Sequence, residues 1–152
     1  EVVEKMREAL GDRFGLFGSG WSRPGGDQIV ALDHAHEIYQ RSKIGLSVSL
    51  NNDLECYTSD RLHRVLGCGA LLLVKSFPMM SVYGLRSGEN CVAWDTADEA
   101  VALARKYVAD FAERDRIAAA GARLAVENHT WDVRMLEVVP YIEVTRAARE
   151  GV

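Results

Sequence analysis

Apolar and polar residues along this chain fall into blocks that predict helices and buried strands in alternation. The clearest block runs from Thr58 to Val74, TSDRLHRVLGCGALLLV. Its first half is predicted to be a short helix, which Ser59 or Asp60 would cap by accepting hydrogen bonds from the first-turn amides. Three residues form an apolar stripe at helical spacing in this half: Leu62, Val65 and Leu66.

The second half of this block predicts a strand covered on both faces. Gly67 and Gly69 end the helix, and the run from Ala70 to Val74 is continuously apolar. A helix that leads into a buried parallel strand is half of a βαβ unit. In such sheets ligands bind at the carboxyl ends of the strands. The pattern therefore indicates where a binding site should lie.

The same reasoning predicts the remaining elements. Helices are expected at residues 1–10, 33–42, 96–111 and 114–128, and again from residue 130, and strands at residues 13–17, 28–32, 44–50 and 91–94. Thr96 and Glu99 form a capping box at the start of one helix. Strands alternating with helices, followed by a helical tail, indicate a single α/β domain, a Rossmann-like three-layer fold with a mainly parallel sheet.

Composition excludes several classes of protein. The 152 residues are 48% hydrophobic and 26% charged, as in an ordinary globular domain. A net charge of -4 argues against nucleic acid as a partner. No apolar run is long enough to span a bilayer and no signal peptide is evident, so a cytoplasmic location is expected. The three cysteines, two of them expected to be buried, predict reduced thiols.

Two polar segments are candidates for binding. A predicted strand runs into Gly18, Gly20 and Trp21, where close approach of backbone to a phosphate or sugar is one interpretation and a flexible surface loop is the other. The loop at residues 51–57 follows another predicted strand. His34 and His36 point to different faces of their helix, so no metal is expected there.

The order of these features resembles a known family, the C-terminal half of GT-B glycosyltransferases, in particular the CgeB-like branch of the glycosyl transferases group 1. The resemblance rests on EIYQRSKIGLSVS, SDRLHRVLGCGALLL, SGENCVAW, TADEAVALARKYV and RDRIAAAGARLAVENHTWDVRM. The last is similar to the family's closing segment with its His-Thr pair and later Arg. His129 is expected to fix the turn into the last helix, and His63 to be a core histidine with a satisfied nitrogen.

The resemblance implies a nucleotide-diphosphate sugar as donor, transfer of its sugar to an acceptor hydroxyl, and no metal or other cofactor. The amides of Ser59, Asp60 and Arg61 are the first candidates for binding the diphosphate. The Arg61 side chain would contact a phosphate, or else lie exposed or pair with Asp53 or Glu55. Lys75 is a second phosphate partner by position. Gly18, Gly20 and Trp21 would line the nucleotide or sugar, although Trp21 fits simple packing equally well.

Two departures from the family pattern affect this interpretation. Arg64 stands where many members carry a Glu that holds the donor ribose, and the position eight residues earlier is Cys56. Arg64 is kept among the candidate donor-binding residues. The acceptor-binding N-terminal domain and the first strand of this half are not in the sequence, so we expect an incomplete enzyme that is truncated at its N-terminus. Such a chain would expose the face that meets its partner domain, and a homo-oligomer is one outcome.

Two rival functions stay open. The first is a non-catalytic nucleotide- or sugar-binding or scaffold domain derived from a glycosyltransferase, which Arg64 in place of Glu favours. The second is a flavodoxin-like domain such as a signalling receiver. A receiver requires an acidic cluster at the strand ends, for which Asp53 and Lys75 alone give little support.

Overall fold

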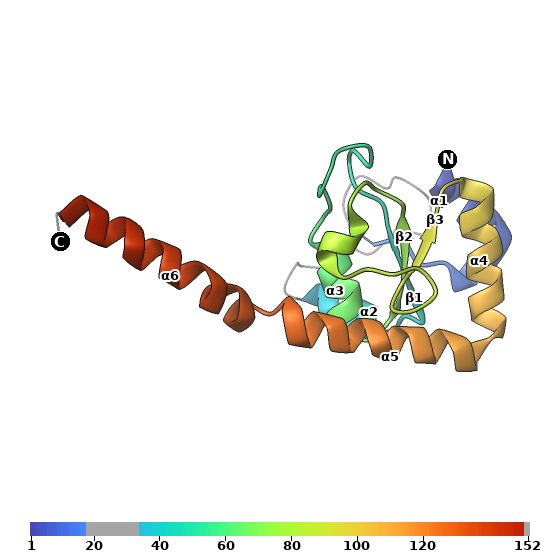
Figure 1. The fold of residues 1–152 in the computed structure, drawn as a ribbon. Coiled ribbons are helices and arrows are strands. Elements are labelled where there is room, and N and C mark those ends of the chain that lie inside the picture. Colours follow the sequence, from blue (N-terminus) through green and yellow to red (C-terminus); the bar gives the residue numbers. More distant parts are fainter. Residues whose placement is uncertain (18–33, 151–152) are drawn as a thin grey trace.

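The computed structural model describes residues 1–17 and 34–150, with side chains described up to residue 143. The described residues form a sheet of three parallel strands in the order β1 (Ile44–Ser47), β2 (Leu71–Lys75) and β3 (Val92–Trp94) (Figure 1). Helices cover both faces of this sheet. The chain is therefore a Rossmann-like α/β domain, as the alternating pattern predicts.

The helices follow the predicted order closely. They are α1 (Val2–Leu10), η1 (Gly11–Arg13), α2 (Ala35–Arg41), α3 (Arg61–Gly67), η3 (Met80–Tyr83), α4 (Ala97–Ala109), α5 (Phe111–Asn128) and α6 (Trp131–Glu150). The strand expected at residues 28–32 lies outside the described residues. The strand expected at residues 13–17 is wrong. Gly11 turns the chain at φ 56°, and Phe17 is left 43% exposed, so this stretch has no continuous buried face.

The unit β1–α3–β2 confirms the βαβ arrangement. Ile44 pairs with Leu71 and Ser47 with Val74, in parallel register. Gly69, at φ 76°, ends α3: its amide donates to the Leu66 carbonyl at 3.0 Å, and the next amide donates to the Val65 carbonyl at 3.3 Å. This pair of bonds is a Schellman motif, which turns the chain directly into β2.

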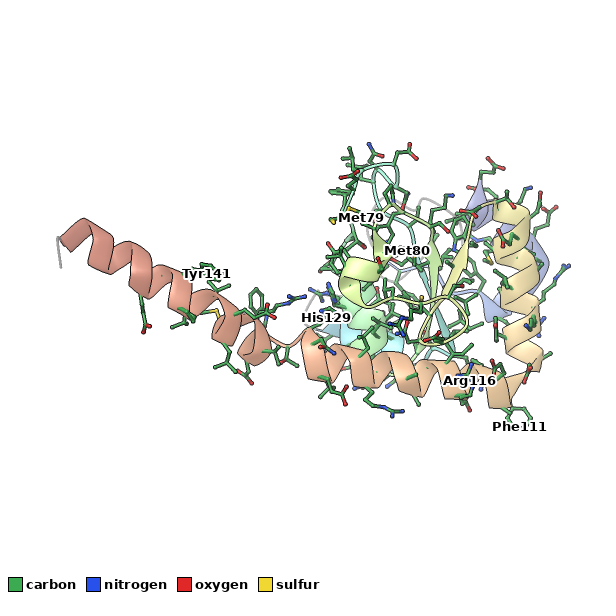
Figure 2. The ribbon with its side chains drawn as sticks, in the orientation of Figure 1. Met79, Met80, Phe111, Arg116, His129 and Tyr141 are labelled. Atoms are coloured by element: carbon green, nitrogen blue, oxygen red, sulfur yellow. The ribbon has the colours of Figure 1, made fainter. Side chains whose placement is uncertain are left out.

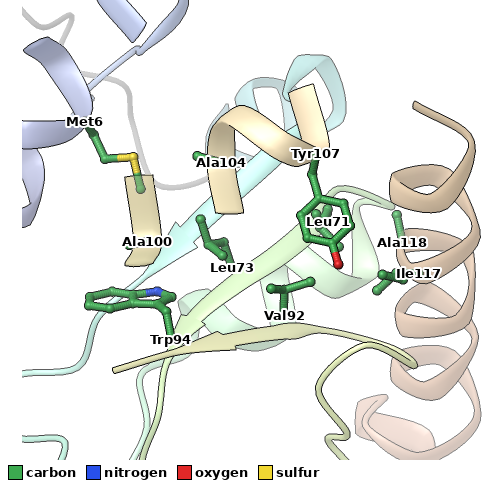
Figure 3. Packing of buried hydrophobic residues seen from close by; sticks show 10 residues of the cluster. All are labelled: Met6, Leu71, Leu73, Val92, Trp94, Ala100, Ala104, Tyr107, Ile117 and Ala118. Carbon is green, nitrogen blue, oxygen red and sulfur yellow. The ribbon is translucent and has the colours of Figure 1, made fainter. Parts of the chain in front are cut away.

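One face of the sheet packs against α1 and α4. Leu73 and Val92 contribute from the strands, Met6 from α1, and Ala100 and Tyr107 from α4 (Figure 3). Small alanines on α4 let the helix approach the sheet closely, and the aromatic ring fills the space beside the first turns of α5. This core fixes the direction of the strands.

The opposite face packs against α3 and the second half of α5. Leu72 and Val74 of β2 meet Leu62 and Leu66 of α3, all of them at most 2% exposed. The alternation of β2 side chains between the two faces explains why Ala70–Val74 reads as one continuous apolar run. The described cysteines are free thiols, but only Cys91 is buried, so the expectation of two buried cysteines is wrong.

The boundary between α4 and α5 differs from the prediction. The apolar period suggested one helix through Phe111, yet Asp110 interrupts it and caps α5 by accepting from the Glu113 amide at 3.2 Å. Phe111 is consequently 67% exposed at the start of α5 (Figure 2). Val126, near the end of α5, is 63% exposed.

The last helix, α6, extends away from the body of the domain (Figure 1). Thr130 caps it as predicted, accepting from the Val133 amide at 3.3 Å, and the helix continues through Pro140. Trp131 and Leu136, two apolar residues of this helix, are 83% and 78% exposed. No helix in the described part of the chain is long and apolar enough to cross a lipid bilayer.

Candidate functional site

The three parallel strands end at one edge of the sheet, where Ser47, Lys75 and Trp94 are their last residues. Helix α3 connects two parallel strands and runs in the opposite direction to them, so its first turn lies at this same edge. The loops before α3, after β2 and after β3 therefore meet there. This is the edge at which the sequence predicted a ligand.

Arg61 begins α3 and ties this helix to the end of β1. Its Nη1 donates to the Val48 carbonyl at 3.1 Å. The ion pair with Asp53 or Glu55, considered as an alternative, is not the contact that forms. A carbonyl oxygen orients the guanidinium without neutralising it, so the positive charge of Arg61 is held at the edge of the sheet.

Asp60 and Arg64 form a pair one helical turn apart. Arg64 Nε donates to the Asp60 carboxylate at 2.8 Å. The expected side-chain cap of α3 is wrong, because neither the Ser59 nor the Asp60 side chain accepts from a first-turn amide. Instead the Leu62 amide donates to the backbone carbonyl of Ser59 at 3.1 Å. The carboxylate of Asp60 is thus used to hold Arg64.

Hydroxyl groups around the same edge make no hydrogen bond within the described residues. They are Ser47 Oγ at the end of β1 and Thr58 Oγ1 and Ser59 Oγ before α3. Ser47 is only 1% exposed. Buried hydroxyls normally have partners, since a lost hydrogen bond costs about 1–3 kcal/mol. These three hydroxyls are thus buried and unpaired in the described structure.

Lys75, the last residue of β2, lies against the end of β3. Its Nζ donates to the Asp95 carbonyl at 2.9 Å, is 3.7 Å from the Asp95 carboxylate, and lies 5.6 Å from the centre of the Trp94 ring. The side chain is 28% exposed. Lys75 and Arg61 thus bring two cations to the ends of neighbouring strands.

Two loops at this edge are tied together by residues that the sequence analysis did not single out. Tyr83 Oη donates to the Cys56 carbonyl at 2.5 Å, and Cys56 Sγ lies 3.9 Å from Met79 Sδ. Cys56 and Met79 both have positive φ, 53° and 61°, which is strained for residues with a side chain. No periodicity marks such contacts, because they join loops that are distant in sequence.

His63 lies on the inner side of α3, beside Tyr83 and His129. Burial, and then the nearby His129 and Arg134, lower the pKa of His63, while Asp60 opposes this shift. The His63 side chain is only partly buried, and its Nδ1 atom is buried with no partner in the described structure. His63 is therefore not the core histidine that was expected, and its Nδ1 is not satisfied.

The remaining sequence candidates are Gly18, Gly20 and Trp21, which lie outside the described residues. Within residues 1–17 and 34–150, no group of three or more His, Cys, Asp or Glu side chains is placed to hold a metal. His34 instead contacts Glu37, 3.0 Å away on its own helix. The acidic cluster that a signalling receiver requires is thus absent from the described part of the chain.

Comparison with known families decides between the fold-level alternatives. The family described as glycosyl transferase-like matches residues 1–139, which includes all three strands and the candidate edge. The chain belongs to the glycosyl transferase-like family. Neither curated proteins nor solved structures gave a match. The family match covers most of the chain, and with it the helix α3 and the His129–Thr130 pair that carried the resemblance.

Proposed function

We propose that this glycosyl transferase-like chain is the donor-binding domain of a GT-B glycosyltransferase. It would bind a nucleotide-diphosphate sugar at the carboxyl edge of the sheet. The observation that carries the proposal is the pair of cations, Arg61 and Lys75, at the ends of neighbouring strands in a chain of this family. A diphosphate is the part of the donor that two such cations would bind.

The proposed donor site combines three kinds of group. Arg61 and Lys75 would bind the phosphates, together with the backbone amides of Ser59 and Asp60. Arg64 lies at the same edge and would contact the nucleotide beside its Asp60 partner. From the sequence alone, a further set would line the nucleotide or sugar: Gly18, Gly20 and Trp21.

The reaction transfers one sugar. The acceptor hydroxyl oxygen forms a bond to the anomeric carbon, the bond from that carbon to the diphosphate oxygen breaks, and the diphosphate leaves with the electron pair. The hydroxyl proton passes to a base. Charge develops on the leaving diphosphate, so cations fixed beside it stabilise the transition state more than the ground state. This arrangement would need no divalent metal.

A second, acceptor-binding domain would supply the base and the other wall of the active site. Large apolar side chains on α6, including Trp131, Leu136 and Tyr141, are 76–83% exposed. A helix with exposed apolar residues on several sides is normally covered by another surface. We propose that the acceptor-binding domain covers it.

Thermal unfolding with nucleotides tests donor binding. The chain is heated with UDP, GDP, ADP, TDP or CMP, each at about one millimolar, and a ligand at about 100 times its Kd adds roughly 2.7 kcal/mol of stability. For a domain of this size that is a rise of roughly 5–10 °C in Tm. A rise with one nucleoside diphosphate is the expected result, and it identifies the donor class.

The Arg61→Ala variant tests the phosphate contact. Losing one charge-assisted hydrogen bond should weaken binding roughly tenfold to a hundredfold. Arg123→Ala is the matched control, because Arg123 is an exposed arginine on α5, the helix that passes the opposite edge of the sheet. Equal loss in both variants would contradict a specific role for Arg61. No Tm rise with any nucleotide, in a folded chain, would contradict donor binding.

The alternative is a non-catalytic scaffold or binding domain. Arg64, bound to Asp60, favours it because the resemblance places a ribose-binding Glu at this position. Arg64→Glu separates the two functions. In a donor-binding domain the restored carboxylate should tighten binding of the nucleotide identified above, whereas in a scaffold it should have no effect.

A further inference from the structure

His129 occupies the two-residue joint between α5 and α6 (Figure 2). Its amide donates to the Ala125 carbonyl at 2.9 Å and closes α5. Thr130 then caps α6. With only two residues between the helices, the contacts of the His129 ring bear directly on the direction in which α6 leaves the body.

The partners of the His129 ring define its protonation. Nε2 lies 2.9 Å from the Tyr83 carbonyl oxygen, which only accepts, so Nε2 carries the hydrogen and donates. Nδ1 lies 2.9 Å from Arg134 Nη2, and a guanidinium only donates, so Nδ1 accepts. One donating and one accepting nitrogen describe the neutral imidazole. A charged ring would turn an N–H toward the guanidinium.

Charged and aromatic groups from three elements surround the joint. The centre of the His63 ring on α3 lies 4.9 Å from that of the His129 ring, in a tilted arrangement. The Tyr83 ring of η3 lies 6.5 Å away, and Arg134 of α6 is a cation. Asp60 pairs with Arg64, and Glu137 pairs with Arg134 at 3.1 Å. A proton on Nδ1 would bring an N–H and a second positive charge against the Arg134 guanidinium.

We propose that neutral His129 is a latch that fixes the direction of α6, and that protonation of its Nδ1 releases this helix. The two halves of the latch respond differently. Nε2 donates to Tyr83 in either protonation state, so His129 stays attached to the body. A protonated Nδ1 cannot accept a hydrogen bond, so the contact with Arg134 is lost and the first turn of α6 is no longer tied to the His129 ring.

Two measurements on the whole chain test the latch. The ¹⁵N shifts of the His129 ring report its tautomer and protonation, and hydrogen exchange, corrected for intrinsic pH dependence, reports protection of each amide. Both are followed from about pH 8 to about pH 5.5. As Nδ1 takes up its proton, protection at residues 131–135 should fall about tenfold, the loss of one charge-assisted hydrogen bond. Protection at Leu72 and Val74 in β2 should stay constant.

Variants separate the latch from a general effect of acid. Arg134→Leu should show the low protection of residues 131–135 already at about pH 8, because the donor to Nδ1 is gone. His129→Gln keeps a donor toward Tyr83 and cannot titrate, so its protection should not change with pH. The proposal is overturned if ring protonation leaves residues 131–135 protected, if His129 stays neutral throughout, or if His129→Gln shows the same loss. His129→Asn serves as the non-titrating variant if the glutamine form does not fold.

Discussion

Gly45 in β1 is a position where one added carbon should destabilise the fold. A Cβ built there would lie 2.6 Å from both methyl carbons of Val65 on α3, and 3.2 Å from its Cβ. Carbon atoms in favourable contact lie about 3.5–4.0 Å apart. Gly45 is buried and Val65 is 0% exposed, so neither residue has open space to move into. Gly45→Ala must therefore push β1 and α3 apart.

The magnitude follows from the cost of overpacking a core. One inserted carbon in a well-packed site costs about 1–3 kcal/mol, which lowers Tm by roughly 2–12 °C in a domain of this size. Val65→Ala removes the two methyl groups involved and alone costs roughly 2 kcal/mol. In the double variant the new methyl group occupies the space that Val65 vacates. The loss of unfolding free energy in the double variant should therefore be smaller than the sum of the two single losses, by about 1 kcal/mol or more.

Urea unfolding of the wild type, both single variants and the double variant measures this coupling. Gly67→Ala is the control, because a Cβ at this exposed helical position meets nothing within 4 Å. It should stabilise the chain by up to about 1 kcal/mol. A Gly45→Ala variant as stable as the wild type, or single costs that add fully, would refute the packing argument.

Three further predictions concern single groups. Burial lowers the pKa of His63 below its ordinary value of 6.5, so the unfolded chain binds the proton more readily than the folded chain. The contribution of His63 to the unfolding free energy should be complete above pH 6.5 and should fall as the pH drops below 6.5. His63→Phe should reduce this dependence of the urea midpoint on pH. Burial raises the pKa of Cys91 to about 12, so a thiol reagent at about pH 8 should label Cys56 and Cys68 well before Cys91. Thr96 accepts from the Glu99 amide at 3.1 Å, so Thr96→Ala should lower the unfolding free energy by about 1 kcal/mol while Thr96→Ser keeps most of it.

The sequence predicted an element correctly where its own apolar pattern showed which of its faces are covered by the rest of the fold. Ala70–Val74 is continuously apolar because both faces of β2 are covered, and the structure leaves each of these residues at most 2% exposed. The capping box at Thr96 is also local, although Glu99 accepts from the Asp95 amide, one residue before the cap. Phe111 was misplaced because helical period gives a face but does not tell whether anything packs on it.

The contacts of the candidate site depend on the assembled fold. Arg61 reaches the Val48 carbonyl thirteen residues earlier, and Lys75 reaches Asp95 twenty residues later. The sequence placed both cations at the correct edge, because the βαβ rule fixes which strand and helix ends meet. It did not give their partners, since these depend on loop paths that no periodic signal describes. The same limit applies to Tyr83, whose hydroxyl holds the Cys56 loop.

The distinction between carboxylate and carbonyl partners determines the charge that this edge presents. Arg64 is neutralised by Asp60 at 2.8 Å, so the pair adds little net charge. Arg61 is held by a carbonyl, so its charge persists, whereas Lys75 donates to a carbonyl at 2.9 Å and also forms an ion pair with the Asp95 carboxylate at 3.7 Å. A phosphate approaching Arg61 would exchange a neutral partner for an anionic one and displace no existing ion pair. The proposed diphosphate contact of Arg61 therefore does not depend on the Glu that the resemblance places at position 64.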